Sequence, residues 1–230
     1  MSEKPSLVLL HGALGARDQF DALVPFLEDR YALHLINFEG HGDQPLIHPC
    51  FRVEYFAKSL NSYLEENNIE RTNLFGYSLG GYTAMYLAAT HPYRIRRVFT
   101  LGTRFSWSPE LAARECKLLN PDLMIQKIPE YAGLLQERHT ALGWRVMLEE
   151  TAELLIDLGE KDLLWHNLEK VTLPVRIGVG DSDRMAGLEE SVAAYRLVTN
   201  GQLEIFPSTP HPLERISVTT LARSIIEFFS

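Results

Sequence analysis

The stretch Gly76-Tyr77-Ser78-Leu79-Gly80 decides the fold, because it places a serine between two glycines where a strand-like run gives way to a helix-like run. Residues 72–75 are typical of a short buried strand, and residues 79–90, rich in Ala, Leu, Met and Tyr, of a buried helix. At such a turn the serine needs a strained backbone, and a side chain at either flanking position would collide with the adjoining strand and helix. The pattern predicts a raised serine hydroxyl, with the Leu79 N–H at the helix start pointing where an oxyanion would form.

Two further glycine motifs follow the first two strand-like runs. His11-Gly12-Ala13-Leu14-Gly15 follows the run 6–10, and Glu39-Gly40-His41-Gly42-Asp43 follows the run 32–37. Together with the serine turn, these motifs resemble the α/β-hydrolase family over nearly the whole chain, in its branch with a serine nucleophile and a helical cap. The resemblance implies that the first motif is an oxyanion loop, in which the Ala13 N–H is the second donor.

Length and composition fit a single domain over residues 1–230. Hydrophobic residues make up 46% of the 230 residues, which is enough to build one full core. The formal net charge of −8 argues against nucleic acid or an anionic membrane surface as a partner, because both are bound by a concentrated basic face. The basic run Arg94, Arg96 and Arg97 is short and is interpreted as a solvated turn.

The cysteines and the first residues indicate a cytoplasmic protein. Cys50 and Cys116 lie far apart in a chain too large to need a disulfide, so we expect reduced thiols. The first residues lack the basic flank and long apolar stretch of a signal peptide, and no run is long enough to cross a bilayer. We expect a protein that acts on a small-molecule substrate, without a membrane or nucleic-acid partner, as a monomer or a homodimer.

Strand-like and helix-like runs alternate along the chain, which predicts an α/β fold with helices on both faces of a parallel sheet. The predicted strands are 6–10, 32–37, 72–75, 97–101, 175–179 and 203–206. The predicted helices between and after them are 20–27, 53–67, 79–90, 188–198 and 213–229. The resemblance implies that the six strands have the order 2-1-3-4-5-6 in a three-layer α/β/α arrangement.

The alternation stops between Thr103 and Leu168, where only helix-like segments occur. These predicted helices are 109–119, 121–128, 134–142, 144–158 and 162–168. An insertion after the fourth strand is where the family has its cap, so the resemblance implies a cap over the serine that excludes water and walls the substrate pocket. The alternative is that these helices only complete the core.

A serine hydroxyl attacks a carbonyl at neutral pH only if an imidazole removes its proton and a carboxylate orients that imidazole. The family's chain order is serine, acid, histidine. Among the histidines after Ser78, His211 lies between the last strand and the last helix, where the family has its base, and is the predicted base. His91 is interpreted as a helix-terminus residue, and His139 and His166, in the predicted cap, are expected at the surface.

Two aspartates compete for the acid. The segment Gly180-Asp181-Ser182-Asp183 follows the strand 175–179 and resembles the family's G-x-x-D segment, whose fourth position is the acid. Asp183 is therefore the predicted acid. Asp181 is the alternative, or else a turn residue that bonds the amides of its own loop.

Candidate substrate contacts are Tyr77 beside the serine, Arg104 just past the fourth strand, and the aromatic residues Phe105 and Trp144. An arginine can meet a substrate carboxylate and aromatic rings can wall an apolar pocket, although both are also common on surfaces and in cores. No pair of histidines has helical metal-ligand spacing and no phosphate-binding loop motif occurs. We predict neither a metal nor a cofactor, and expect His11 and His41 to hold their loops by hydrogen bonding.

These patterns predict a carboxylesterase-like serine hydrolase that cleaves an ester or thioester through an acyl-enzyme. A lyase or a hydrolase of carbon–carbon bonds on the same Ser-Asp-His triad is the second enzymatic hypothesis, because this fold does not fix the reaction. A small-molecule receptor on a hydrolase scaffold is the hypothesis from a different class.

Overall fold

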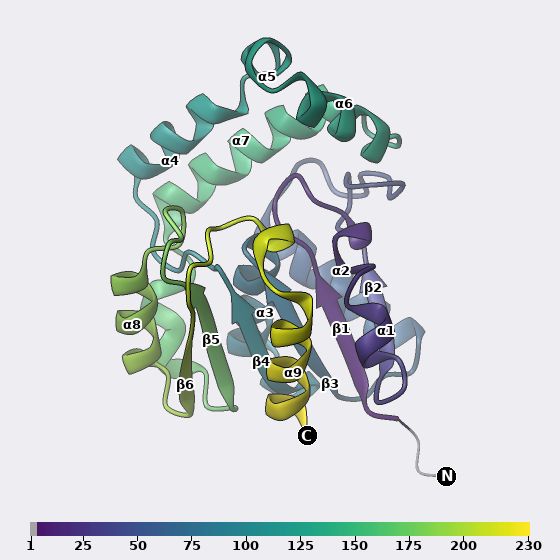
Figure 1. Cartoon of the computed structure of the whole chain (residues 1–230), viewed down its shortest axis with the longest axis vertical. Coiled ribbons are helices and arrows are strands. Elements are labelled where there is room, and N and C mark those ends of the chain that lie inside the picture. Colours follow the sequence, from purple (N-terminus) through teal and green to yellow (C-terminus); the bar gives the residue numbers. More distant parts are fainter. Residues whose placement is uncertain (1–3) are drawn as a thin grey trace.

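Six parallel strands form the central sheet of the computed structural model, which describes residues 4–230 (Figure 1). They run in the order β2-β1-β3-β4-β5-β6. Their bounds are β1 Ser6–Leu10, β2 Ala32–Ile36, β3 Thr72–Tyr77, β4 Ile95–Leu101, β5 Val175–Gly180 and β6 Gly201–Phe206. The predicted strand number and strand order are confirmed. Because all strands are parallel, the loops at their carboxyl ends meet along one edge, where ligands bind in such sheets.

Helices cover both faces of the sheet, with α9 in front of it and α2 and α3 behind it in Figure 1. Successive strand residues point to opposite faces, so Leu7 and Leu9 of β1 pack with α9 while Val8 and Leu10 pack with α2 and α3. The helices flanking the sheet are α1 Val24–Leu27, α2 Val53–Glu66, α3 Leu79–Thr90, α8 Leu188–Leu197 and α9 Val218–Phe229. Short 3₁₀ helices are η1 Arg17–Phe20, η2 Pro92–Arg94, η3 Lys117–Leu119, η4 Trp165–Lys170 and η5 Leu213–Arg215.

The chain between β4 and β5 is helical and lies above the carboxyl ends of the strands (Figure 1). We call residues 103–168 the helical insert. Its helices are α4 Pro109–Cys116, α5 Pro121–Lys127, α6 Pro129–Arg138 and α7 Trp144–Lys161. The first three begin with a proline, whose missing N–H is harmless at a first helical position.

Several predicted helices differ from the structure: only Val24–Leu27 of the helix predicted over 20–27 is α-helical, and the helix predicted over 162–168 is replaced by the 3₁₀ helix η4. The helix predicted over 134–142 runs over Pro129–Arg138, because Pro129 starts it a full turn earlier than its apolar residues suggest. The helix predicted over 213–229 is split, and α9 begins at Val218 after Ser217, whose hydroxyl caps it by accepting the Thr220 N–H at 3.4 Å.

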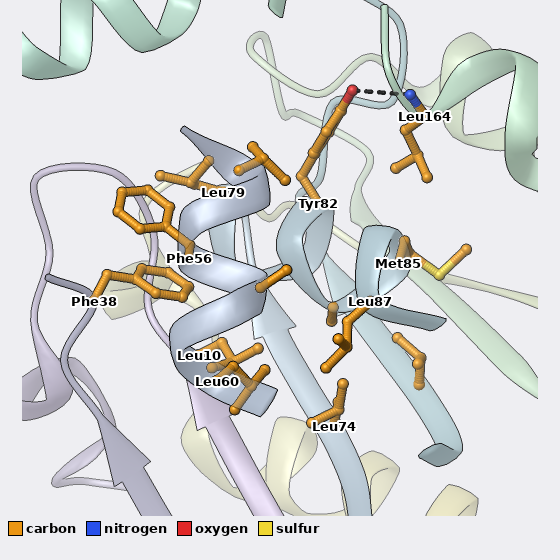
Figure 2. Packing of buried hydrophobic residues seen from close by; sticks show 14 of the residues in the cluster. Leu10, Phe38, Phe56, Leu60, Leu74, Leu79, Tyr82, Met85, Leu87 and Leu164 are labelled. Atoms are coloured by element: carbon orange, nitrogen blue, oxygen red, sulfur yellow. Dashed lines mark hydrogen bonds between the residues drawn. The ribbon is translucent and has the colours of Figure 1, made fainter. Parts of the chain in front are cut away.

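A tyrosine on α3 ties the helical insert to the sheet layer. Figure 2 shows Tyr82 rising from the packed side chains around α3 toward Leu164, whose N–H donates to the tyrosine hydroxyl at 3.1 Å. The ring is 2% exposed, so this bond is made away from competing water. Among the helices of residues 4–230, none has the length and apolar character needed to span a membrane.

We expect Gly80→Ala to lower the free energy of unfolding by at least about 2 kcal/mol, since overpacked sites lose amounts of this order. A methyl group on this α3 residue would lie 2.1 Å from the Leu10 carbonyl oxygen, so α3 would have to move away from β1. Gly133→Ala in α6 is the matched control. A methyl there meets nothing within 4 Å, so stability should rise by about 0.5–1 kcal/mol. Urea denaturation measures both, and equal midpoints for Gly80→Ala and wild type would contradict the packing argument.

Candidate active site

Ser78 forms the sharp turn between β3 and α3 that its glycine neighbours predict. Its backbone is strained, with φ 52° and ψ −116°. The turn is held by the Ser78 N–H, which donates to the Leu101 carbonyl at 2.8 Å. A Cβ on Gly76 would lie 2.4 Å from the backbone nitrogen of Gly81, so no side chain fits there. The flanking glycines thus permit the strain that raises the serine side chain into the cavity described below.

His211 and Asp183 form a hydrogen-bonded pair beside this turn. His211 Nδ1 lies 2.8 Å from Asp183 Oδ2, and the aspartate side chain is 2% exposed. The other oxygen, Oδ1, accepts the N–H groups of Met185 at 2.8 Å and Ala186 at 2.9 Å, which fixes the carboxylate in plane. An aspartate that accepts from Nδ1–H leaves Nε2 as the free acceptor of the imidazole, which is the arrangement a general base needs.

Asp181, the alternative acid, has a different set of partners. Its Oδ1 accepts the Thr209 N–H at 3.2 Å and the Ser182 hydroxyl at 3.0 Å, so it closes its own loop. The backbone of Ser208 first, and then the Ser182 hydroxyl, hold the pKa of the Asp181 carboxyl below its usual value by hydrogen bonding. The structure therefore brings the imidazole of His211 to Asp183 and leaves Asp181 with loop amides and a hydroxyl.

Two further residues hold this pair in place. The Tyr77 hydroxyl donates to the His211 carbonyl at 3.0 Å, and the two rings lie 5.4 Å apart. Gly102, which the sequence analysis missed, has φ +58°, and a Cβ on it would lie 3.2 Å from Asp183 Oδ2 and 3.4 Å from His211 Nδ1. A glycine directly after the fourth strand was the available sequence signal. Its backbone packs against the bond between the aspartate and the histidine.

The loop after β1 carries Ala13, whose N–H the family resemblance implies as an oxyanion donor. The Gly12 carbonyl accepts from His11 Nδ1 at 2.8 Å and from the Gly15 N–H at 3.1 Å. In a trans peptide the N–H points opposite to the carbonyl, so these two bonds also orient the Ala13 N–H. The Leu79 N–H lies in the first turn of α3 and has no intrahelical acceptor. Ala13 and Leu79 both line the same cavity as Ser78.

A cavity of about 640 Å³ lies between the helical insert and the carboxyl ends of the strands. Ser78 and His211 line its floor, and the insert supplies its apolar walls. The insert residues that carry these apolar groups include Leu118, Leu119, Met124, Leu155 and Leu158. A cavity of this size and lining suits a small molecule with an apolar part.

The candidate substrate contacts divide into two groups. Tyr77 and Arg104 line the cavity, whereas Phe105 and Trp144 are buried in the core at 0% and 8% exposure and lie outside the described cavity lining. Arg104 lies 3.7 Å from Glu115 and over the Trp107 ring at 5.3 Å, so its charge already has a partner. That Arg104 meets a substrate carboxylate remains a prediction.

One of the other histidines, His139, does not lie where the sequence predicted. His166 is exposed, as expected, but His139 is 1% exposed and makes two backbone hydrogen bonds, so the expectation of a surface position is wrong. His11 and His41 are fully buried, and burial lowers the pKa of His11 to about 4. In residues 4–230, no three His, Cys, Asp or Glu side chains are grouped so that they could hold a metal ion.

The chain matches the family model described as alpha/beta hydrolase fold over residues 5–126. This span is more than half of the chain and contains the loop after β1, the serine turn and four of the six strands. The chain therefore belongs to the α/β-hydrolase family, and the resemblance stated from the sequence motifs is confirmed.

Its similarities to particular proteins include esterases, a monoacylglycerol lipase of Mus musculus and, over 85 residues, a 2-succinyl-6-hydroxy-2,4-cyclohexadiene-1-carboxylate synthase of Pectobacterium atrosepticum. A pimeloyl-[acyl-carrier protein] methyl ester esterase of Neisseria meningitidis serogroup C is 26% identical over 223 residues, which cover 88% of this chain and 85% of the relative. An enzyme of that name from Aeromonas hydrophila is 36% identical over 111 residues, 48% of this chain and 41% of the relative. The enol-lactonase of Burkholderia xenovorans LB400 shares the fold, with a TM-score of 0.82 at 17% identity over 99% of this chain and 92% of that one. By these similarities the chain is a carboxylesterase-like member of its family.

We expect Gly102→Ala to lower kcat for ester hydrolysis by about 10²-fold, the loss that a displacement of about 1 Å can cause. The added methyl would press on Asp183 Oδ2 and His211 Nδ1, and a positive φ is unfavourable for alanine. Steady-state kinetics on a p-nitrophenyl ester, with circular dichroism to verify folding, measure the effect. A folded variant with wild-type kcat would show that the backbone at 102 does not position the pair.

Proposed function

We propose that this chain is a serine hydrolase that cleaves a carboxylic ester or thioester of a small molecule through an acyl-enzyme. The proposal is supported above all by the 2.8 Å bond between His211 and Asp183 at a cavity that Ser78 also lines. A serine on a strained turn, an imidazole with a free Nε2 and a buried carboxylate behind it are the three groups that nucleophilic acyl transfer requires.

In the proposed reaction, Ser78 Oγ attacks the carbonyl carbon while His211 Nε2 takes its proton. The imidazolium then gives that proton to the leaving alcohol or thiol, and water, deprotonated by the same nitrogen, releases the acid. Asp183 keeps the proton of the neutral imidazole on Nδ1 and stabilises the imidazolium. In the second step, with water, the imidazolium returns its proton to Ser78 Oγ, so acylation and deacylation together regenerate the serine hydroxyl and the neutral histidine without a cofactor.

The charge that develops on the carbonyl oxygen would be bound by the N–H groups of Ala13 and Leu79. Both residues line the cavity together with Ser78, and each such donor is worth about 3 kcal/mol in the transition state. Because the loop after β1 and the start of α3 are held by separate hydrogen bonds, the two donors would be in place before the substrate arrives.

The helical insert would act as the cap and determine which esters fit. Its apolar side chains face a cavity of about 640 Å³, and the cavity-lining cations Arg104 and Arg138 are paired with Glu115 and Asp18. A lining of this kind favours an uncharged apolar acyl group, because burying an unpaired charge there would be costly. The curated relatives are named for the hydrolysis of a methyl ester, which supports a carboxylic ester as the bond that is cleaved.

Ser78→Ala should abolish turnover of short p-nitrophenyl esters and labelling by a fluorophosphonate probe, because both need the serine oxygen. Wild-type protein should be labelled at Ser78, as peptide mass spectrometry would show. Absence of labelling and turnover in the wild type would favour a small-molecule receptor instead. Turnover that persists in the variant would place the nucleophile elsewhere.

Asp183→Asn should lower kcat by about 10⁴-fold, since an asparagine favours the wrong imidazole tautomer. Asp181→Asn is the matched control, two residues away in the same loop. That variant keeps an oxygen to accept the Thr209 N–H, so its kcat should stay within a few-fold of wild type. Equal losses in the two variants would argue against Asp183 as the acid.

A further inference from the structure

The end of α6 is the place where the helical insert meets the loop after β1. Arg138, the last residue of α6, donates to Asp18 Oδ2 from Nε at 3.1 Å and from Nη2 at 2.9 Å. Thr140, two residues later, donates its N–H to the Gly42 carbonyl at 3.1 Å. Between them lies His139, which is 1% exposed.

The His139 imidazole bridges two loops of the sheet layer. Its Nδ1 accepts the Gly42 N–H at 3.0 Å, and its Nε2 lies 3.0 Å from the Leu14 carbonyl oxygen. An amide N–H needs an acceptor and a carbonyl needs a donor, so only the neutral ring with its proton on Nε2 satisfies both. Burial and the nearby Arg138 lower the pKa of His139, which keeps the ring in this neutral form.

The carbonyl that His139 holds belongs to a strained residue of the oxyanion loop. Leu14 has φ +60°, a conformation that costs a residue with a side chain of this size about 1 kcal/mol or more. It directly follows Ala13, the proposed oxyanion donor. His11 holds the Gly12 carbonyl on one side of that donor, and His139 holds the Leu14 carbonyl on the other.

We infer that His139 is a positioning residue of the oxyanion hole. Through its two hydrogen bonds, the docking of the helical insert on the sheet layer orients the Ala13 N–H. The inference rests on the proposed function and deepens it. It implies that the insert acts on the transition state as well as on substrate binding. A loss of the bridge should therefore appear in kcat rather than in KM.

The test compares His139→Leu, which keeps bulk but no polar atom, with His139→Gln, whose amide offers one acceptor and one donor. We expect His139→Leu to lower kcat for a p-nitrophenyl ester by about tenfold to a hundredfold, with KM within threefold of wild type. His139→Gln should recover at least a third of the wild-type kcat. His166→Gln, at an exposed position of the same insert, is the control and should behave as wild type.

Hydrogen exchange gives a readout that is independent of catalysis. In His139→Leu, exchange should rise in peptides that cover residues 11–17, while peptides from β3 and β4 stay protected. In the wild type, a long-range ¹H–¹⁵N spectrum should show His139 neutral with its proton on Nε2, which keeps the inference testable if His139→Leu does not fold.

Three results would overturn the inference: wild-type kcat in folded His139→Leu, an equal loss of kcat in His139→Gln and His139→Leu, or an Nδ1–H tautomer in the spectrum. Failure of the proposed function is a separate result. It would appear as unchanged ester turnover in Ser78→Ala, or as no turnover in the wild type, whatever the histidine variants do.

Discussion

The close packing of α3 against the end of β1 is the constraint on which the site depends. Gly80 lies so near the Leu10 and His11 carbonyls that no side chain fits between them. This contact sets the start of α3, and with it the Leu79 N–H, beside the loop that carries Ala13. Ser78, which precedes Leu79, must then adopt the strained turn, and the glycines at 76 and 80 bring its side chain together with the backbone of Ala13 and Leu79, the proposed oxyanion donors.

Local signals predicted most of the fold. Buried strands are short apolar runs, and their six predicted positions agree with the structure to within two residues at every end. The turn at Ser78 was also predictable from local sequence, because the glycines at 76 and 80 indicate a tight turn of the backbone at their own positions. Helix boundaries in the insert were less predictable: Pro129 starts α6 by a local rule, but apolar spacing suggested Leu134.

The parts that the sequence did not predict depend on contacts between distant segments. Asp183 was predicted as the acid only by resemblance to a family segment, because its local chemistry is the same as that of Asp181, and the loop that carries His211 decides which aspartate meets the imidazole. Phe105 and Trp144 are aromatic residues of the kind that line apolar pockets, yet both are buried in the core. The buried bridge at His139 joins α6 to loops more than ninety residues earlier, and no periodic pattern reports such a pairing.

The helical insert is placed between two neighbouring strands of the sheet, β4 and β5, which pair in parallel from Val98 and Val175 to Leu101 and Gly178. Because these strands are parallel, the chain leaves β4 after Leu101 at the carboxyl edge of the sheet and, after η4, re-enters the sheet at Val175, opposite Val98. The helical insert can therefore be lengthened, shortened or replaced without a change in the register of any strand. The walls of the cavity can thus vary as one unit, provided that the insert keeps its packing in the common hydrophobic core and its bonds to the sheet layer at Tyr82 and His139.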